Sequence, residues 1–444
     1  MWFCPRAGLE CLIATVLTLE SQVDQKQDVV IRESISAGAS LEIESSVNLK
    51  GKMFEYKPDG KESKQTAIWA SGGSRYRERF LDVTSDREVT ATARRYLSAT
   101  LDKQNGDHKE RVVLRPVAER VVFRRATDQS TIFSPDGPLM SAELDLLQAD
   151  AFTAAFAGLL PPKPVKLGDQ WPAKPVAASE LTGVEPIQSG SMNCVLREVK
   201  SNDAGTVARV NLSGTLSGPT DQGPTQMTIE GHLLFDLDTQ LITYVLMNGR
   251  SEIMDSAGRA AGQLDGRYEL TRRPAIDDPR LSDAALKELV LKPTPETTAL
   301  LFESSNLAIR FTYPRNWELT SVTKNIIQLE EPTGGSLRLT VDATPAPTAD
   351  KLRGELLTWL KGQKAGGVEP GAIESTQLSD SRKADRFTVR AALNKSEREW
   401  TYLVVRQNDR TATLAANFVA DRAEPLQIDL VTVARRLDFL PKSR

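Results

Sequence analysis

Alternation of apolar and polar residues dominates the N-terminal part of the chain. Leu41, Ile43, Val47 and Leu49 share one parity, whereas charged and amide residues take most of the positions between them. A period of two is typical of a strand with one buried face. Similar runs follow at 65–70, 75–81, 88–100, 111–115 and 119–125, separated by turn-forming clusters such as Pro58-Asp-Gly60 and Gln104-Asn-Gly106. The pattern predicts an antiparallel meander.

The period changes between residues 141 and 160. One face of a helix with 3.6 residues per turn collects Leu144, Leu147, Ala151, Phe152, Ala155, Phe156 and Leu159. Ser141 is a suitable N-cap, and Pro161-Pro162 would end the helix. Strands return at 191–199, 206–217, 225–235, 241–250 and 262–271. We therefore expect a β-rich domain over 27–272, a curved sheet or half-barrel whose apolar concave face this helix covers.

The remaining sequence predicts a linker and a second domain. Residues 273–299 are rich in Pro, Asp and Lys, with one short apolar helix at 283–291, which is typical of an interdomain linker. Residues 300–444 mix periods of two with helical periods at 349–364 and 425–437. We expect an α+β sheet there, with helices on one or both faces and enough residues for a core of its own.

Composition excludes several classes of protein. The chain has 444 residues, so more than one domain is expected at roughly 100–200 residues each. Its 56 basic and 59 acidic side chains give a net charge of −3, which provides no global field to attract nucleic acid or anionic lipid. The basic run Arg120, Arg124 and Arg125 and the pair Arg435-Arg436 are too small to change that expectation. We expect no nucleic-acid partner and no transmembrane segment in the mature chain.

The N-terminus has features of an export signal. The uncharged run 11–19 has the length of a signal-peptide core and is too short to span a bilayer, and Arg6 precedes it. No typical cleavage site follows, and Glu10 is unfavourable, so a mis-assigned start is the alternative. We expect residues 1–21 to be a signal peptide and the protein to lie in the periplasm or cell envelope, or in the cytoplasm if this segment is not a signal.

Cysteine and histidine offer little chemistry. Removal of a signal would take Cys4 and Cys11 with it and leave Cys194, which we expect to be a small buried residue. The two histidines are His108 in a polar hairpin loop and His232 at the opening of a strand, and no Gly-x-Ser-x-Gly motif accompanies either. We expect no catalytic residue, no cofactor and no metal site.

Glycine and carboxylate clusters have structural interpretations. Gly72-Gly73-Ser74 and Gly334-Gly335-Ser336 lack the Lys of a phosphate-binding loop, so both are expected to be hairpin turns. The pairs Glu330-Glu331 and Asp277-Asp278 should diverge if their segments are extended, because adjacent strand residues face opposite ways. Asp236 and Asp238 point together but lack the Gly and distal Glu of a calcium loop, so turn chemistry is expected.

The C-terminal third contains the run Ala308-Ile-Arg-Phe-Thr-Tyr-Pro-Arg-Asn-Trp317, followed by a hairpin, a helix, further strands and a terminal helix up to about Phe439. In these features it resembles the domain shared by the photosystem II protein PsbP and the nuclear import factor Mog1. Pro314 presets a turn and Trp317 is expected to bury its ring against the sheet. The resemblance implies an α/β sandwich that binds other macromolecules and does not catalyse.

Two stretches mark the N-terminal two thirds, namely 159–171 (Leu-Leu-Pro-Pro-Lys-Pro-Val-Lys-Leu-Gly-Asp-Gln-Trp) and 231–238 (Gly-His-Leu-Leu-Phe-Asp-Leu-Asp). In these stretches the chain looks like exported proteins of unknown function from bacteria such as planctomycetes, a resemblance that implies export and no assigned chemistry. The order of strands, helix and strands is also similar in outline to lipoprotein-carrier half-barrels, without a shared motif.

Three functional hypotheses follow. The first is a non-enzymatic exported binding or scaffold protein for a hydrophobic small molecule or a protein partner, which predicts an apolar groove or patch. The second is a hydrolase-like enzyme with a carboxylate-based site at the domain junction, which predicts titratable groups with shifted pKa values in a pocket. The third is a purely structural envelope component, with neither feature.

Overall fold

A computed structural model describes residues 21–22, 28–57, 62–125, 130–203, 205–342 and 346–441. Residues 1–20 of the predicted signal segment, with Cys4 and Cys11, and the turn cluster at 58–60 lie outside the described residues. The chain divides into two compact units. The first comprises the described residues up to Leu114, those of 123–128, and Gln148–Leu286; the second comprises Arg115–Val122, the described residues of 129–147, and the described residues from Lys287 onward.

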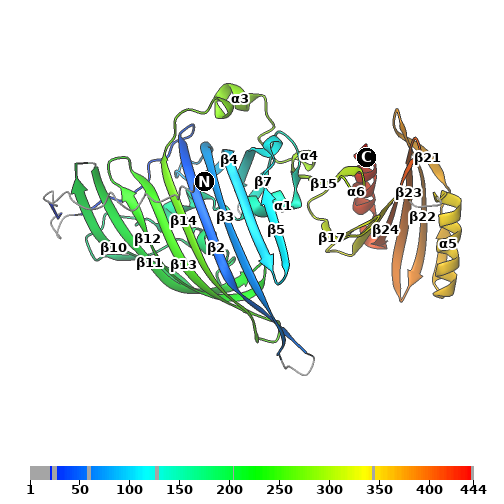
Figure 1. The fold of residues 1–444 in the computed structure, drawn as a ribbon, viewed down its shortest axis with the longest axis horizontal. Helices are drawn as coiled ribbons and strands as arrows, with labels where there is room; N and C mark the ends of the chain where they lie inside the picture. The colour runs from blue at the N-terminus through cyan, green and yellow to red at the C-terminus, as the bar shows by residue number, and fades with distance from the viewer. Residues whose placement is uncertain are drawn as a thin grey trace, which may run out of the picture. The chain divides into compact units, whose positions relative to one another are not determined.

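One long antiparallel sheet organises the first unit. Figure 1 shows its main strands side by side, in the order β1-β10-β11-β12-β13-β14-β2-β3-β4, with β5 beside β4 and β9 beside β10. The bounds are β1 (Ser21–Gln22), β2 (Ser40–Tyr56), β3 (Glu62–Val83), β4 (Val89–Asn105), β5 (His108–Val113), β9 (Gln170–Pro172), β10 (Ser189–Asn202), β11 (Gly205–Thr220), β12 (Gly223–Asp236), β13 (Leu241–Met254) and β14 (Ala260–Pro274). The predicted antiparallel meander is confirmed, and the closing pair β14 and β2 joins its two halves.

The sequence prediction was wrong at Gly72-Gly73-Ser74. These residues are not a hairpin turn but lie in the middle of β3, which runs without a break across the two strands expected at 65–70 and 75–81. Gly72 pairs with Val47 of β2 and with Leu101 of β4. The two glycines therefore keep strand geometry because both neighbouring strands bond to them.

The single helix predicted over 141–160 is also wrong. Helix α1 (Ser141–Gln148) begins at Ser141 itself, so Ser141 is not the N-cap, and a 3-10 segment, η2 (Thr153–Leu159), follows after an irregular step. In that step Asp150 accepts hydrogen bonds from Ser45 and Ser74, and the Ala151 carbonyl accepts one from Arg94. A continuous helix would use the Ala151 carbonyl itself, so the sheet's buried polar side chains interrupt it.

The apolar face of the first sheet is covered by η2 and by a helix that the sequence analysis missed, α2 (Pro175–Thr182). Phe156 and Leu159 of η2 are fully buried, and the Trp171 indole donates to the Leu159 carbonyl at 2.8 Å. The stretch 159–171 thus has a structural task, since it connects η2 to β9 and anchors that connection to the core.

Glycines allow neighbouring strands of this sheet to approach closely. A Cβ atom at Gly214 of β11 would lie 2.1 Å from the Ser191 carbonyl oxygen, and one at Gly231 of β12 would lie 2.1 Å from that of Leu246. No side chain fits at such distances without a backbone shift. Glycine at these two positions is therefore required by the backbone itself.

Two sheets form the second unit. The small one has the order β25-β16-β15-β8, in which β8 and β15 are parallel. The large one has the order β17-β18-β19-β24-β23-β22-β20, with β21 beside β22. The bounds are β8 (Leu139–Met140), β15 (Leu300–Ser304), β16 (Ile309–Tyr313), β17 (Glu318–Val322), β18 (Ile326–Glu331), β19 (Gly335–Val341), β20 (Gly366–Pro370), β21 (Glu374–Ser379), β22 (Arg382–Leu393), β23 (Ser396–Gln407), β24 (Arg410–Val419) and β25 (Asp438–Phe439).

Helices pack on the large sheet of the second unit, as the mixed periodicity predicted. Helix α5 (Ala349–Gly362) packs Leu356 and Leu360 against Phe387 and Val389 of β22. Helix α6 (Ala423–Arg435) contacts β23 and β24. Its Gln427 bonds to Arg386 and Glu399, which alternate along their strands with the residues that face α5 and therefore project from the other face. The unit is thus an α+β arrangement with a helix on each face.

The segment between residues 115 and 147 groups partly with the second unit. Arg115 donates to Glu143 at 2.6 Å and to the Pro138 carbonyl at 3.0 Å, and β8 extends the small sheet. Strands β6 (Arg120–Arg125) and β7 (Ser130–Phe133), with η1 (Pro116–Ala118), lie where the division between the units cuts this segment.

The proline-rich segment 273–299 contains the other division, between Leu286 and Lys287. Its short elements are η3 (Pro279–Leu281), α3 (Asp283–Lys287) and α4 (Pro295–Thr298), and η4 (Ala420–Arg422) precedes α6. Helix α3 is shorter than the helix expected at 283–291. Thr294 and Thr297 close a capping box at the start of α4.

The close approach of strands at Gly214 predicts that adding a single methyl group there lowers the stability of the protein. We expect Gly214→Ala to lower the free energy of unfolding by about 1–3 kcal/mol, because its Cβ would meet the Ser191 carbonyl. The exposed neighbour Ser213 provides the control, and Ser213→Ala should change stability by less than about 0.5 kcal/mol. Urea unfolding of both variants measures the difference; equal stabilities would contradict the steric argument.

Candidate functional site

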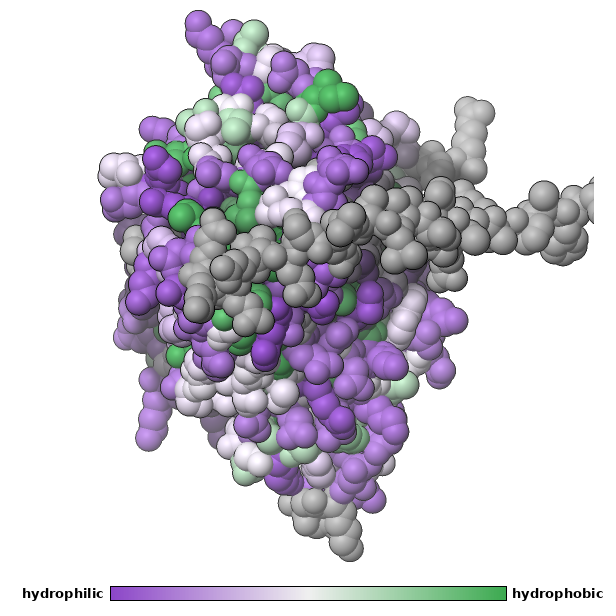
Figure 2. Space-filling view, turned by 90° about the vertical axis from the view of Figure 1, so that its left-hand side faces the viewer, coloured by the Kyte–Doolittle hydropathy of each residue, from purple (hydrophilic) through white to green (hydrophobic). Residues whose placement is uncertain are grey.

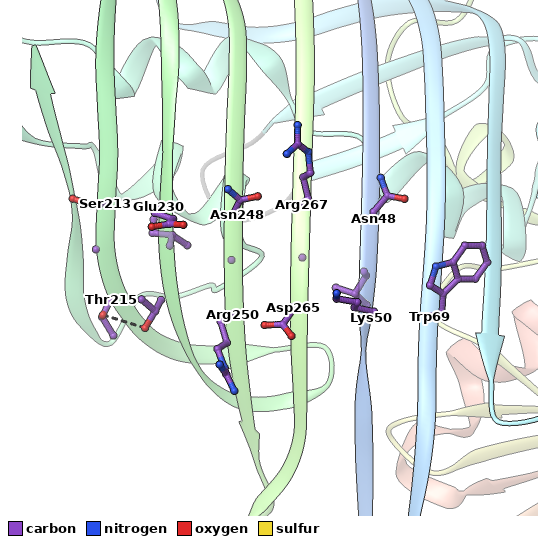
Figure 3. A pocket seen from close by; sticks show the side chains of 16 residues that line it. Asn48, Lys50, Trp69, Ser213, Thr215, Glu230, Asn248, Arg250, Asp265 and Arg267 are labelled. Carbon is purple, nitrogen blue, oxygen red and sulfur yellow. Dashed lines mark hydrogen bonds between the residues drawn. The ribbon is translucent and has the colours of Figure 1, made fainter. Parts of the chain in front are cut away.

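A hollow of about 820 Å³ lies on the polar face of the large sheet of the first unit. Figure 3 shows the side chains that line it, which come from six neighbouring strands, β11, β12, β13, β14, β2 and β3. These strands are adjacent in the sheet order, so the hollow runs across the strands.

Two rows of polar side chains flank the hollow. The first, which we call the Asn row, consists of the cross-strand neighbours Ser213, Glu230, Asn248, Arg267 and Asn48. The second, the Trp row, consists of Thr215, Thr228, Arg250, Asp265, Lys50 and Trp69. Because strand side chains alternate between faces, both rows project from the same face.

The floor between the rows is mainly backbone. It consists of Gly214, Ile229, Gly249, Gly266 and Leu49, which pair across the strands in that order. Ile229 is buried, which places its side chain on the apolar face beneath the hollow. The floor therefore offers backbone, not side chains, to a bound molecule.

Most charged groups of the hollow are unpaired within the described part of the chain. Among the described residues, the side chains of Lys50, Glu230, Arg250 and Asp265 form no hydrogen bond or ion pair. Arg267 differs, since it donates to Glu269 at 3.1 Å on its own strand. Unpaired charges of both signs at one hollow are available to a polar ligand.

Trp69 is the aromatic member of the lining and is 43% exposed. Trp171, Trp317 and Trp400 are buried instead. Large aromatic rings normally bury their surface in a core, so an exposed one beside a hollow is typical of a binding surface.

The opposite face of the same sheet holds a buried polar cluster, which we define as Ser45, Ser74, Tyr76, Glu78, Arg94, Tyr96, Asp150 and Thr153. Arg94 and Glu78 are completely buried and form an ion pair at 2.7 Å. The Arg94 guanidinium also lies 3.7 Å from the centre of the Phe123 ring. Thr153 donates to the other oxygen of Glu78 at 2.6 Å.

Burial shifts the ionisation of this cluster. It raises the pKa of the Asp150 carboxyl, against the opposing effects of Arg94 and the two serine hydroxyls. It also raises the pKa values of Tyr76 and Tyr96. These shifted groups lie in the core, among partners that hold η2 to the sheet, so we interpret the cluster as structural.

A third electrostatic feature lies further along the polar face. Glu42 accepts hydrogen bonds from Arg75 and Arg273, each at 2.6 Å, and Arg77 approaches it at 3.6 Å. The hydrogen bonds from Arg75 and Arg273 hold the pKa of Glu42 at about 2.

Cys194, His108 and His232 are the residues at which the sequence analysis considered catalysis and expected none. Cys194 is fully buried, as predicted, and burial raises the pKa of its thiol to about 12. His108 is the exposed first residue of β5 and not a loop residue. His232 lies well inside β12 instead of opening it, half-buried against the Tyr244 ring, and burial lowers its pKa.

The acidic pairs act within the fold. Asp236 accepts hydrogen bonds from the backbone of Asp238 and Thr239, which confirms the turn. Glu331 is buried and Glu330 exposed, so that pair diverges as predicted.

Asp278 of the pair Asp277-Asp278 caps η3 and bonds to arginines. It accepts from the Arg280 backbone at 3.0 Å, from Arg95 at 3.1 Å and from Arg77 at 3.3 Å. These contacts explain the residue without a catalytic role.

The remaining sequence features are structural too. Gly334 forms a turn with φ at +111°, as predicted. The Trp317 ring is buried and donates to Asp429 at 2.9 Å, and Pro314 begins the preceding turn.

The basic residues that the sequence analysis singled out are largely ion-paired. Arg120 pairs with Asp136, Arg124 with Asp82, and Arg125 with Glu180. Arg436 pairs with Glu296 at 3.5 Å.

The described residues contain no group of three or more His, Cys, Asp or Glu side chains that could hold a metal ion. Within the same residues, every helix is too short or too polar to cross a membrane. Figure 2 shows one side of the described surface, on which hydrophobic residues lie singly or in small groups among hydrophilic ones.

Sequence reasoning missed the hollow. Its lining residues alternate with buried residues along six strands, so the pattern of each strand by itself predicts only an ordinary strand with one solvated face. The only local signal was Trp69, an aromatic residue at a position where the alternation along β3 predicts exposure.

The buried ion pair generates a stability prediction. We expect Glu78→Ala to lower the free energy of unfolding by about 3–5 kcal/mol, because it leaves the Arg94 guanidinium buried without its partner. Glu230→Ala removes an exposed carboxylate of the hollow and should change stability by less than about 0.5 kcal/mol. Chemical denaturation measures both; a loss below about 1 kcal/mol for Glu78→Ala would contradict the assigned role.

The depressed pKa of Glu42 generates a pH prediction. Its ion pairs should contribute stability above about pH 4.5, and this contribution should be lost as the pH falls toward 2. We expect Glu42→Gln to cost about 1–2 kcal/mol at pH 6, a reduced value because Arg75 and Arg273 are half-exposed or more. The unfolding midpoints of the wild type and of Glu42→Gln, measured between pH 2 and 6, should converge toward pH 2. A difference that stays constant over this range would refute the depressed pKa of Glu42.

Comparisons with known proteins place the chain in no family. No family model matches it, and no curated protein does. Among solved structures it is similar to cyanobacterial PsbP from Synechocystis, at 14% identity and a TM-score of 0.26 over 32% of this chain and 92% of that one. A Mog1 mutant aligns at 12% identity and a TM-score of 0.24, over 32% of this chain and 96% of that one. OprB from Pseudomonas putida aligns at 7% identity and a TM-score of 0.13, over 86% of this chain and 92% of that one.

Proposed function

We propose that the protein is a non-enzymatic binding protein whose ligand lies in the hollow of the large sheet. The observation that carries this proposal is the set of charged side chains, Lys50, Glu230, Arg250 and Asp265, which face the hollow without partners among the described residues. Charged groups of a solvated face often form cross-strand ion pairs, and Arg250, Asp265 and Lys50 are direct neighbours that do not. Groups left unpaired in this way are free to bind an external molecule.

The lining favours binding over catalysis. It includes neither His nor Cys, so the hydroxyls of Ser213, Thr215 and Thr228 have no imidazole beside them to act as a base. Thr215 and Thr228 approach each other at 3.4 Å. This arrangement can hold a polar molecule by hydrogen bonds.

The polar lining changes the expected ligand. The sequence analysis expected a hydrophobic small molecule or a protein partner at an apolar groove or patch, but the apolar face of this sheet packs against η2 and α2. A polar ligand on the opposite face is the proposal that the hollow favours.

Export and the role of the C-terminal residues remain predictions. We propose that the protein acts in the cell envelope, on the strength of the hydrophobic run at 11–19 and the resemblance of 159–171 to exported proteins. We further propose a sandwich of the PsbP and Mog1 type for residues 300–444, with a role in protein interaction. The segment 308–317 and the order of hairpin, helix, strands and helix support this proposal.

Native mass spectrometry of the full protein purified from its own host tests the binding function. We expect a small molecule retained by the wild type and lost from Arg250→Ala, whose side chain faces the hollow. Arg209→Ala is the matched control, because Arg209 lies on the same face of β11 outside the hollow and should leave the bound mass unchanged. The same spectra report whether residues 1–21 are removed.

Ligand-free spectra for all three proteins would contradict a binding role. A bound mass that survives Arg250→Ala would place the ligand elsewhere. A protein that retains Met1 would contradict export and leave the binding proposal standing.

A further inference from the structure

We propose that the hollow binds an extended, uncharged oligosaccharide. This inference rests on the proposed binding function and names its ligand class. It is carried by the exposed ring of Trp69, the planar polar groups of the two rows, the balance of charge between them and the length of the hollow.

Trp69 offers an aromatic surface at one end of the Trp row. It is 43% exposed, and its cross-strand neighbour in that row is Lys50 of β2. The axial C–H groups of a pyranose ring form an apolar patch that stacks on an indole, while its hydroxyls stay at the ring edge. A ligand with both kinds of surface fits one aromatic ring surrounded by polar groups.

The polar groups of the rows match paired hydroxyls. Asn248, Glu230, Asp265 and Arg250 each end in a planar group with two hydrogen-bonding atoms side by side. Vicinal hydroxyls of a sugar present a donor and acceptor pair at similar spacing, so one planar side chain can bond to two of them. Figure 3 shows these side chains at intervals along both rows, from neighbouring strands.

The charges of the hollow favour a neutral ligand. Arg267 is already bonded to Glu269. The remaining charged groups are two cations, Lys50 and Arg250, and two carboxylates, Glu230 and Asp265. A polyanion such as a nucleic acid would meet both carboxylates, whereas the hydroxyls of a neutral saccharide can donate to carboxylates and accept from cations.

The length of the hollow favours a chain over a single ring. It crosses six adjacent strands, and five interstrand spacings of about 4.8 Å give roughly 24 Å. The floor positions project their side chains to the opposite face, as buried Ile229 does, so no side chain of the floor divides the hollow into separate pockets. Several sugar units can therefore lie across the strands at once.

Isothermal titration of the full protein with defined sugars tests the proposal. The probes are hexasaccharides of α-1,4-linked glucose, β-1,4-linked glucose, β-1,4-linked xylose and β-1,4-linked N-acetylglucosamine, together with the monosaccharides. We expect at least one hexasaccharide to bind about tenfold or more tightly than its monosaccharide, because only the chain contacts several strands. If none of the four hexasaccharides binds, the proposal is wrong.

Trp69→Ala should weaken that binding about tenfold or more, and Trp69→Phe should restore part of it, because both aromatic rings stack. Trp359→Ala is the matched control, since Trp359 is 46% exposed on α5 in the second unit and should leave the affinity unchanged. Asp265→Asn, which keeps a planar polar group, should weaken binding less than Asp265→Ala. Equal loss in the Trp69 and Trp359 variants, or none in either, would overturn the site.

The outcomes separate this inference from the proposed function. A host-derived ligand that is lost from Arg250→Ala but is a peptide or another non-saccharide would overturn the saccharide inference and leave the binding function standing. Saccharide binding that Trp69→Ala and Asp265→Ala leave intact would overturn the hollow as the site for both.

Discussion

The buried pair of Arg94 and Glu78 is the interaction on which the first unit depends. Two full charges without exposure are tolerated only when every nearby group compensates them. Here the Thr153 hydroxyl donates to Glu78 and the Ala151 carbonyl accepts from Arg94, and these two residues lie at the start of η2 and in the irregular step before it. The buried charges of Arg94 and Glu78 therefore require the segment around Ala151 and Thr153 to lie directly against them, which explains why the helix predicted over 141–160 is broken there.

A second layer of buried contacts extends the same logic across the sheet. Arg272 of β14 donates to the Thr153 carbonyl at 3.2 Å and to Glu33, whose other partner is the Ile242 backbone. Burial raises the pKa of Glu33, and Arg272 opposes that effect. One short segment of chain thus ties β14 to β3 and β4, from which β14 is distant in sequence. With the inner face held in this way, the polar face is left free to be shaped by other demands.

Local patterns in the sequence were sufficient for much of the fold and for none of the hollow. The alternation at Leu41 and Ile43 predicted a strand with one buried face, and the polar loop at Asp236 predicted its turn, because both depend on neighbouring residues alone. The break at Asp150 and the continuity of β3 through Gly72 depend on partners at least 25 residues away, so no local period predicts them. The hollow is harder still, since its lining residues meet only through the register of six strands.

The register also explains why stability and binding can be separated in this sheet. On β2, Ser45 belongs to the buried cluster, whereas Asn48 and Lys50 on the opposite parity belong to the hollow. Hydrogen bonds and an ion pair link Ser45, Ser74 and Asp150, and Glu78, Arg94 and Thr153, so substitutions in the cluster should be felt by the whole unit. Lys50, Glu230, Arg250 and Asp265 of the hollow form no ion pair within the described residues, and the fold therefore gains little from these four charges. Natural sequences tend to depart from mutual satisfaction of charges at functional sites. Among the described residues Glu230, Arg250 and Asp265 stay unpaired on one face of a sheet whose other face holds the buried Arg94–Glu78 pair, and this contrast is what supports the proposal of an external ligand.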